Sequence, residues 1–172
     1  MTSERRKQLP RRRRPHRLPR EWYQWPEQPV FVTVCARGGI CLSEGHIAPR
    51  IVGAMGRLGA VCKVRVHAYC IMPDHMHVVV SVAHDGGDLA KWIRYVKRQT
   101  ARVLGLPALW QRSYWDRHAR RDQDVAAAVD YLLYNPVRRQ LCEEPCDWPY
   151  SWSEWDPEAR GPDPNVTQAM ME

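Results

Sequence analysis

The chain has 172 residues, 44% of them hydrophobic, and a formal net charge of +7. This length fits one domain with a real hydrophobic core. No apolar run approaches the roughly 18 residues of a membrane-spanning helix, and no apolar segment follows the basic N-terminus as in a signal peptide, so we expect a cytoplasmic protein. The six cysteines form no C-x-x-C pair, which argues against structural zinc and favours reduced thiols.

The positive charge is concentrated in two parts of the chain. Residues 1–20 hold nine Lys or Arg and one acidic residue, whereas the remainder holds 17 basic and 18 acidic residues. Residues 91–121 carry a second excess, with nine basic side chains against one acid. A basic arm and a basic face on a nearly neutral body favour binding to a polyanion such as nucleic acid.

The arm at residues 1–22 contains four arginines between Pro10 and Pro15 and very few apolar side chains. It is too polar to fold alone, so we expect a disordered arm that contacts DNA, since guanidinium groups suit phosphates. Its candidate DNA-binding residues are Arg11, Arg12, Arg13, Arg14 and Arg17. A solvated tail without function remains the alternative.

The periodicity of apolar residues then predicts alternating elements. In chain order these are a strand at 30–36, a helix at 49–62, strands at 64–72 and 75–83, a helix at 88–104, an edge strand within 109–120 and a helix at 122–135. Pro73-Asp74 would join the two middle strands as a tight hairpin, and Asp88 would cap the helix that follows. This order predicts an α+β fold, a ferredoxin-like antiparallel sheet with helices on one face.

We place the folded domain at residues 23–155 and expect the polar, Pro-rich residues 156–172 to be a disordered tail. Within the domain, the helix at 88–104 has an apolar stripe surrounded by basic side chains. We expect these to bind DNA; they are Lys91, Arg94, Lys97, Arg98 and Arg102.

The stretch "IMPDHMHVVVSV" at 71–82 carries two histidines in an apolar strand. Side chains alternate along a strand, so His75 and His77 project from the same face. Two buried core histidines would be the simplest interpretation. However, Asp74 can orient an imidazole, and a metal that polarises phosphate suits a protein built for nucleic acid, so the pair is a candidate metal site.

A second candidate group lies in "VDYLLYNPVRR" at 129–139. On a helix, residues four apart share a face, so Tyr131 and Asn135 point the same way. An amide oxygen suits Mg²⁺ or Mn²⁺, and a tyrosine beside such a cation can act as a nucleophile. Tyr134 is then expected to turn toward the core or the basic helix. Alternatively, Tyr131 and Asn135 are a core tyrosine and a helix-ending residue.

These stretches together resemble a known family. "MPDHMH" resembles the His–hydrophobic–His motif of the HUH single-strand DNA endonucleases, and "WQRSYWDRHAR" with "VDYLLYNPVRR" is similar to the REP-associated tyrosine transposases, over roughly residues 28–150. The resemblance implies the HUH endonuclease fold. It also implies that His75, His77 and Asn135 are metal ligands and that Tyr131 is the catalytic nucleophile.

The function implied by this resemblance is a metal-dependent single-strand DNA endonuclease and strand transferase. It would use Mg²⁺ or Mn²⁺, bind hairpins of the repetitive extragenic palindrome (REP) type, and cleave through a 5′-phosphotyrosine. A monomer associated with the bacterial nucleoid is expected. Two alternatives remain: a domesticated hairpin-binding protein that no longer cuts, and a metallohydrolase of small molecules, which the basic arm disfavours.

Overall fold

The computed structural model describes residues 26–118 and 122–166. Its elements are β1 (Val30–Cys35), α1 (Ile47–Cys62), β2 (Val64–Ile71), β3 (His75–Val82), α2 (Leu89–Val103), β4 (Trp115–His118), α3 (Asp122–Leu133), α4 (Asn135–Arg138), the 3-10 helix η2 (Pro145–Asp147) and β5 (Ser151–Ser153). Every predicted strand and helix is present, while α4, η2 and β5 are additional to the prediction.

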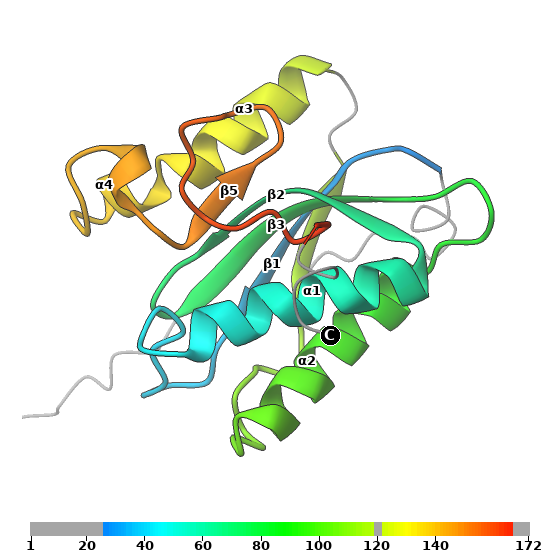
Figure 1. Ribbon diagram of the computed structural model, residues 1–172, viewed down its shortest axis with the longest axis horizontal. Coiled ribbons are helices and arrows are strands. Elements are labelled where there is room, and N and C mark those ends of the chain that lie inside the picture. Colours follow the sequence, from blue (N-terminus) through cyan, green and yellow to red (C-terminus); the bar gives the residue numbers. More distant parts are fainter. Residues whose placement is uncertain (1–25, 119–121, 167–172) are drawn as a thin grey trace, which may run out of the picture.

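The strands form one antiparallel sheet in the order β4-β1-β3-β2-β5 (Figure 1). β3 lies in the centre, and its run of valines is buried on both faces, as expected for a strand with neighbours on either side and helices above and below. The register places Thr33 of β1 opposite His77 of β3. The two histidines therefore lie on the central strand of the sheet.

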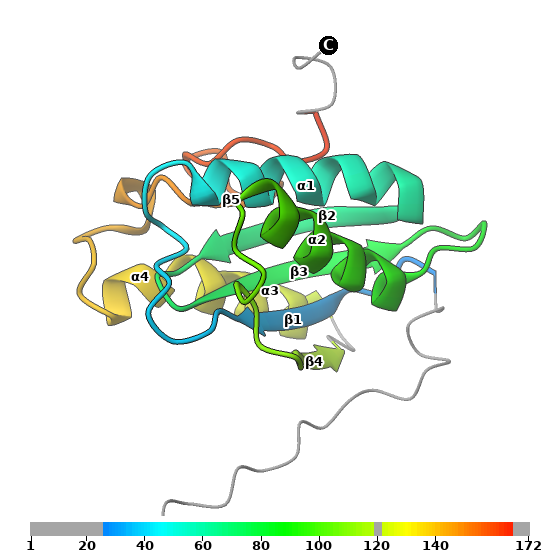
Figure 2. The ribbon, with the colours of Figure 1, turned by 90° about the horizontal axis from the view of Figure 1, so that it is seen from below.

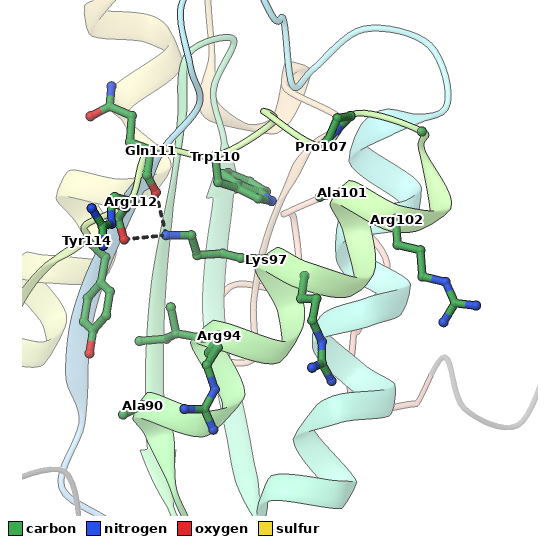
Figure 3. Close-up of a pocket in the computed structure, with 13 residues that line it drawn as sticks. Ala90, Arg94, Lys97, Ala101, Arg102, Pro107, Trp110, Gln111, Arg112 and Tyr114 are labelled. Atoms are coloured by element: carbon green, nitrogen blue, oxygen red, sulfur yellow. Dashed lines mark hydrogen bonds between the residues drawn. The ribbon is translucent and has the colours of Figure 1, made fainter.

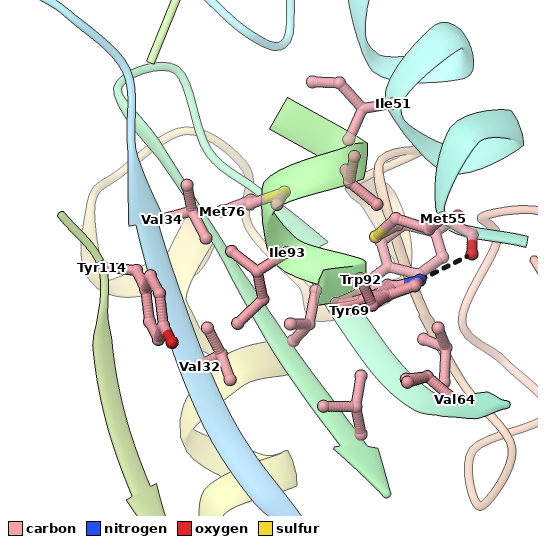
Figure 4. Close-up of a cluster of buried hydrophobic side chains, with 14 of the residues drawn as sticks. Val32, Val34, Ile51, Met55, Val64, Tyr69, Met76, Trp92, Ile93 and Tyr114 are labelled. Atoms are coloured by element: carbon pink, nitrogen blue, oxygen red, sulfur yellow. Dashed lines mark hydrogen bonds between the residues drawn. The ribbon is translucent and has the colours of Figure 1, made fainter. Parts of the chain in front are cut away.

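Helices α1 and α2 cover one face of the sheet (Figure 2). The core beneath them contains Val32 and Met76 from the sheet and the fully buried Trp92 from α2 (Figure 4). A buried indole N–H needs a partner, and Trp92 donates to the carbonyl oxygen of Met55 at 3.1 Å, which joins α2 to α1. The predicted N-cap is confirmed, because the Asp88 side chain accepts from the Lys91 backbone N–H at 2.8 Å.

Helix α3 lies on the opposite face. A second apolar cluster joins Phe31 and Val79 of the sheet to Ala128, Val129 and Leu132 of α3. Alternation along β3 explains the division, since Val78 and Val80 face α1 and α2 while Val79 faces α3. The antiparallel α+β fold is thus confirmed, but the expectation of helices on one face needs correction: it holds for α1 and α2 only.

The end of the last predicted helix also differs in detail. α3 ends at Leu133, and the short α4 begins at Asn135 with Pro136 in its first turn, where proline is tolerated. The helical hydrogen bonding still continues across the junction, because the Tyr134 N–H donates to the Asp130 oxygen and the Arg138 N–H to the Tyr134 oxygen. Tyr131 and Asn135 therefore remain about one turn apart.

A polar cluster fastens the unpredicted strand β5 to the sheet. His67 lies where the β2–β3 register shifts; its Nδ1 is 2.7 Å from Glu154 Oε1 and its Nε2 is 2.8 Å from Ser81 Oγ. The Arg65 guanidinium donates to the other Glu154 oxygen at 2.8 Å, and the Trp155 ring stacks on His67. These contacts satisfy polar groups that would otherwise be left unpaired near the sheet.

The C-terminal segment contradicts the expectation of a disordered tail from residue 156. Asn165 Nδ2 donates to the Val66 carbonyl oxygen at 2.9 Å, and Tyr69 Oη donates to the Pro162 oxygen at 3.0 Å. Residues 156–166 thus pack on β2. The arm at 1–22 and residues 167–172 lie outside the described residues. In the part of the chain that the structure describes, no helix is long and apolar enough to cross a membrane.

Candidate active site

The two histidines of β3 form a close pair. His75 Nε2 lies 3.0 Å from His77 Nε2, and the two ring planes are 75° apart. His77 is 6% exposed, whereas His75 is half-buried. The pair lies on the α3 face of the sheet, because it shares the alternation of Val79. Two ring nitrogens therefore meet at the boundary between the core and solvent.

Each ring is oriented by a neighbouring side chain. His75 Nδ1 is 2.6 Å from Asp74 Oδ1, and because an ionised carboxylate only accepts, Nδ1 is the donor. Thr33 Oγ1 lies 2.8 Å from His77 Nδ1 and fixes the second ring from the neighbouring strand. Such outer partners typically orient metal-ligating histidines.

Burial keeps His77 neutral. It lowers the pKa of His77 to about 3, with a further lowering by the charges of His75 and Arg139 that outweighs the opposing effect of Asp74. The partial burial of Asp74 raises its pKa, but the hydrogen bond with His75 prevails and the pKa lies below its usual value. A neutral imidazole is the form that binds a metal ion.

Tyr131 of α3 lies beside this pair. Its ring centroid is 5.8 Å from that of His77 and 6.3 Å from that of Phe31, and the residue is 45% exposed. The guanidinium carbon of Arg138 lies 4.9 Å from the Tyr131 ring centroid, within the range of a cation–π contact. The phenol is thus held by packing on one side and open to a substrate on the other.

The other two candidate tyrosines are placed differently. Tyr134 is 49% exposed, so the expectation that it turns toward the core or the basic helix is wrong. Tyr114 is buried in the core on the α1 and α2 face, next to Val32 and Ile93 (Figure 4). Tyr131 is the one of the three whose ring contacts a histidine of the pair.

The spacing of the histidine pair suits a hard divalent cation. Two nitrogens 3.0 Å apart match the separation of neighbouring ligands in an octahedral shell with metal–ligand distances of about 2.1 Å. Asn135 is 6% exposed, and its side-chain amide makes no hydrogen bond to any described residue, so a buried polar group is left for another partner. Among the described residues, no three His, Cys, Asp or Glu side chains cluster as a metal site. The structure brings the two imidazoles together, and the Asn135 amide oxygen, about one helical turn from Tyr131, stays the predicted third ligand.

The predicted DNA-binding residues of α2 lie on the other face of the sheet from the histidines. Arg94, Lys97, Arg98 and Arg102 line a groove between α2 and residues 105–114, together with Arg112 (Figure 3). Lys97 has a structural task there, because its Nζ donates to the carbonyl oxygens of Gln111 and Arg112. Lys91 lies outside the groove lining and, with Arg94 and Arg98, surrounds the Tyr95 ring. The arm's Arg11, Arg12, Arg13, Arg14 and Arg17 lie outside the described residues.

The structure adds side chains that the sequence did not single out. Thr33 reaches the pair only through the β1–β3 register, for which the sequence offers no local signal. Arg138 and Arg139 follow Tyr131 in the same motif, and their charge beside an expected metal site could have indicated a role with phosphate.

Comparison with known proteins decides the family. Residues 30–131 match the family model described as "Transposase IS200 like", which spans more than half of the chain. The chain belongs to the IS200-like transposase family. The matched range contains both histidines and ends at Tyr131, and Asn135 lies four residues beyond it.

Individual relatives of this IS200-like transposase agree with that assignment. The chain is 35% identical over 98 residues to a putative REP-associated tyrosine transposase of Haemophilus influenzae, covering 49% of this chain and 56% of the relative. It is 31% identical over 86 residues to the REP-associated tyrosine transposase of Escherichia coli K12, covering 50% and 52%. The chain thus spans about half the length of the curated relatives it matches.

A solved structure shares the fold. It is described as a REP-associated tyrosine transposase bound to a REP hairpin, and it matches with a TM-score of 0.67 and 25% identity over 72% of this chain and 75% of that one. The predicted resemblance to the REP-associated tyrosine transposases is thereby confirmed.

Proposed function

We propose that this IS200-like transposase is a metal-dependent single-strand DNA endonuclease and strand transferase that uses Tyr131 as its nucleophile. The observation that carries the proposal is the position of the Tyr131 ring, 5.8 Å from a buried histidine whose Nε2 faces that of a second histidine. A half-exposed phenol beside two imidazoles offers an oxygen nucleophile and a cation site together.

The covalent step is an in-line displacement at phosphorus. The Tyr131 oxygen gives up its proton to water and attacks the scissile phosphate. The bond to the 3′ oxygen breaks, and that oxygen takes up a proton from water and leaves as a 3′-OH. The 5′ phosphate stays esterified to Tyr131. A second 3′-OH can attack this ester and reverse the step. The phosphotyrosine ester thus keeps the energy of the phosphodiester bond, and no nucleotide cofactor is needed. Arg138, stacked on the ring, brings positive charge to the incoming phosphate.

His75, His77 and Asn135 would hold Mg²⁺ or Mn²⁺. Such an ion, when bound, withdraws negative charge from the scissile phosphate. The donor set favours a hard cation with open positions over zinc in a closed thiolate or three-histidine site. Asp74 and Thr33 keep the two imidazoles in position for that purpose.

The substrate we infer is hairpin DNA of the REP type with single-stranded flanks. The similar solved structure is described as bound to a REP hairpin, and α2 of this chain presents a basic groove. We assign phosphate binding to the arm at 1–22 and to four side chains of α2, Lys91, Arg94, Arg98 and Arg102. The protein would act as a monomer, at the nucleoid in the cytoplasm.

A second candidate function is a hairpin-binding protein without cleavage activity. The position of the basic groove favours this function. Because the groove and the histidine pair lie on opposite faces of the sheet, DNA can bind in the groove without being cleaved. The two functions differ in whether a covalent adduct forms.

The deciding experiment traps that adduct. Imperfect hairpins with randomised single-stranded flanks, labelled at the 3′ end, are incubated with the protein and Mn²⁺ and resolved on a denaturing gel. We expect a labelled protein band that EDTA and Tyr131→Phe remove. Tyr134→Phe is the matched control and should keep the band. An adduct on Tyr131→Phe would refute the assigned nucleophile, and binding without any wild-type adduct would favour the second candidate.

A further inference from the structure

The edge strand β4 carries an exposed tryptophan on the face of the histidine pair. Trp115 is 45% exposed and lies opposite Thr33 in the β1–β4 ladder. Residues directly opposite each other in an antiparallel pair project from the same face. Because Thr33 Oγ1 is 2.8 Å from His77 Nδ1, the Trp115 side chain lies one strand outward from the candidate active site.

An arginine accompanies it along the same edge. Arg117, two residues further along β4, is exposed, and its guanidinium carbon lies 5.8 Å from the ring centroid of Phe31. That ring in turn lies 5.1 Å from His77 and 6.3 Å from Tyr131. Positive charge thus flanks the site on the β4 side through Arg117 and on the α3 side through Arg138.

The backbone beneath Trp115 is firmly held. The preceding residue, Tyr114, is buried in the core on the other face, and the loop before it is fixed by the Lys97 hydrogen bonds to two carbonyl oxygens (Figure 3). This same loop forms one wall of the basic groove of α2. The β4 edge therefore joins the groove on one face to the histidine pair on the other.

We propose that the β4 edge binds an unpaired nucleotide of the substrate next to the scissile phosphate, with its base stacked on Trp115 and its phosphate on Arg117. An indole offers a flat face that every base can stack on, which suits a single strand of variable sequence. Bases inside a hairpin stem are already stacked on each other and do not present that face. The inference rests on the proposed function and adds where the single-stranded flank runs.

Binding measurements without metal test this separately from cleavage. The probes are one hairpin with single-stranded flanks and the same hairpin with a blunt end, both measured by fluorescence anisotropy in EDTA. We expect Trp115→Ala to weaken binding of the flanked hairpin by roughly 5- to 140-fold, the range for losing one stacked base, and to leave the blunt hairpin unchanged. Trp115→Phe should restore most of the affinity.

A matched control is available in Trp155, which is 51% exposed beside His67, near the other edge of the sheet. Trp155→Ala should bind both probes as the wild type does. In addition, 2-aminopurine placed along the flank should be quenched at one position by wild type and by Trp115→Phe, but not by Trp115→Ala. A general loss of folding would affect both probes, so it cannot produce this pattern.

Two results would overturn the inference. One is equal affinity of wild type and Trp115→Ala for the flanked hairpin. The other is an equal loss on both probes, which would make Trp115 structural or a contact to the stem. In either case a Tyr131-dependent adduct would still support the proposed function. Conversely, a Trp115-dependent flank contact with no wild-type adduct would support the edge site and reject cleavage.

Discussion

The face of the sheet beneath α3 and the face beneath α1 and α2 differ in what their polar side chains do. On the α3 face, a short hydrogen-bonded chain joins Thr33, His77, His75 and Asp74, and the Tyr131 ring packs against His77. On the α2 face, the cations line an open groove or surround one tyrosine ring. The first group is oriented for one position, while the second offers charge over a broad surface.

This difference suggests a division of labour. An oriented group in a partly buried setting suits a reaction that needs atoms placed within fractions of an ångström. Exposed arginines on a helix suit contact with a phosphate backbone, where affinity is electrostatic and tolerant of sequence. Substitutions on one face should then change the reaction, and substitutions on the other should change affinity.

Removing a histidine of the pair should give the largest effect. We expect His77→Ala to abolish the covalent adduct on a denaturing gel, because the proposed cation would lose a ligand, while hairpin affinity in a gel-shift assay stays near that of wild type. His84→Ala, at an exposed histidine near the end of β3, is the control and should cleave normally. Loss of hairpin binding by folded His77→Ala would break the division between the faces.

The hydrogen bond from β1 should matter less, but on the reaction alone. We expect Thr33→Val to slow adduct formation by roughly 10- to 100-fold, the range seen when an outer partner of a metal ligand is removed. Thr33→Ser keeps the hydroxyl and should retain most of the rate. Single-turnover rates at saturating DNA measure this. Identical rates for the Val and Ser variants would show that Thr33 does not orient His77.

Charge removal in the groove should act on affinity. We expect Arg94→Gln with Arg102→Gln to weaken hairpin binding and to reduce the slope of log K against log salt by about 0.7 to 0.9 for each phosphate that the protein no longer neutralises. The adduct rate at saturating DNA should not change. Arg37→Gln with Arg50→Gln removes the same charge from exposed positions outside the groove and should leave the slope unaltered.

The local parts of this division could be predicted from the sequence. Alternation on a strand puts His75 and His77 on one face, and helical spacing puts Tyr131 and Asn135 about one turn apart, whatever the rest of the chain does. The N-cap at Asp88 is equally local. These predictions need only neighbours within a few residues.

The parts that depend on distant residues could not be predicted. Thr33 lies beside His77 because of the β1–β3 register. The path of the chain after β4 determines which face of the sheet α3 covers. The segment at 156–166 looks like a disordered tail because it is polar, but Asn165 satisfies the backbone of Val66 at the β-bulge of β2. Polarity alone does not distinguish a solvated tail from one that pairs with unsatisfied backbone groups.

The smallest expected effect concerns stability in acid, and it tests whether polar groups near the α3 face serve the fold as well as the reaction. The partial burial of Glu154 raises its pKa, but hydrogen bonds from Arg65 and His67 outweigh this and bring the pKa below 4.5, its ordinary value. A carboxyl group with a lowered pKa in the folded state stabilises the protein above its unfolded pKa, and this stabilisation is lost as pH falls through the folded value.

The melting temperature of wild type should therefore fall as the pH is lowered from about 5 to below 4. That of Glu154→Gln should fall less over the same interval, because a glutamine side chain takes up no proton there. At neutral pH the variant should melt below wild type.

Asp85→Asn is the control: Asp85 also has a lowered pKa through its bond to Lys63, but the pair is exposed to solvent. Screening by water should make its effect on the acid slope small. A slope that changes equally in both variants would show that the Glu154 cluster behaves as an ordinary surface ion pair and that the polar chemistry near the α3 face contributes nothing special to folding.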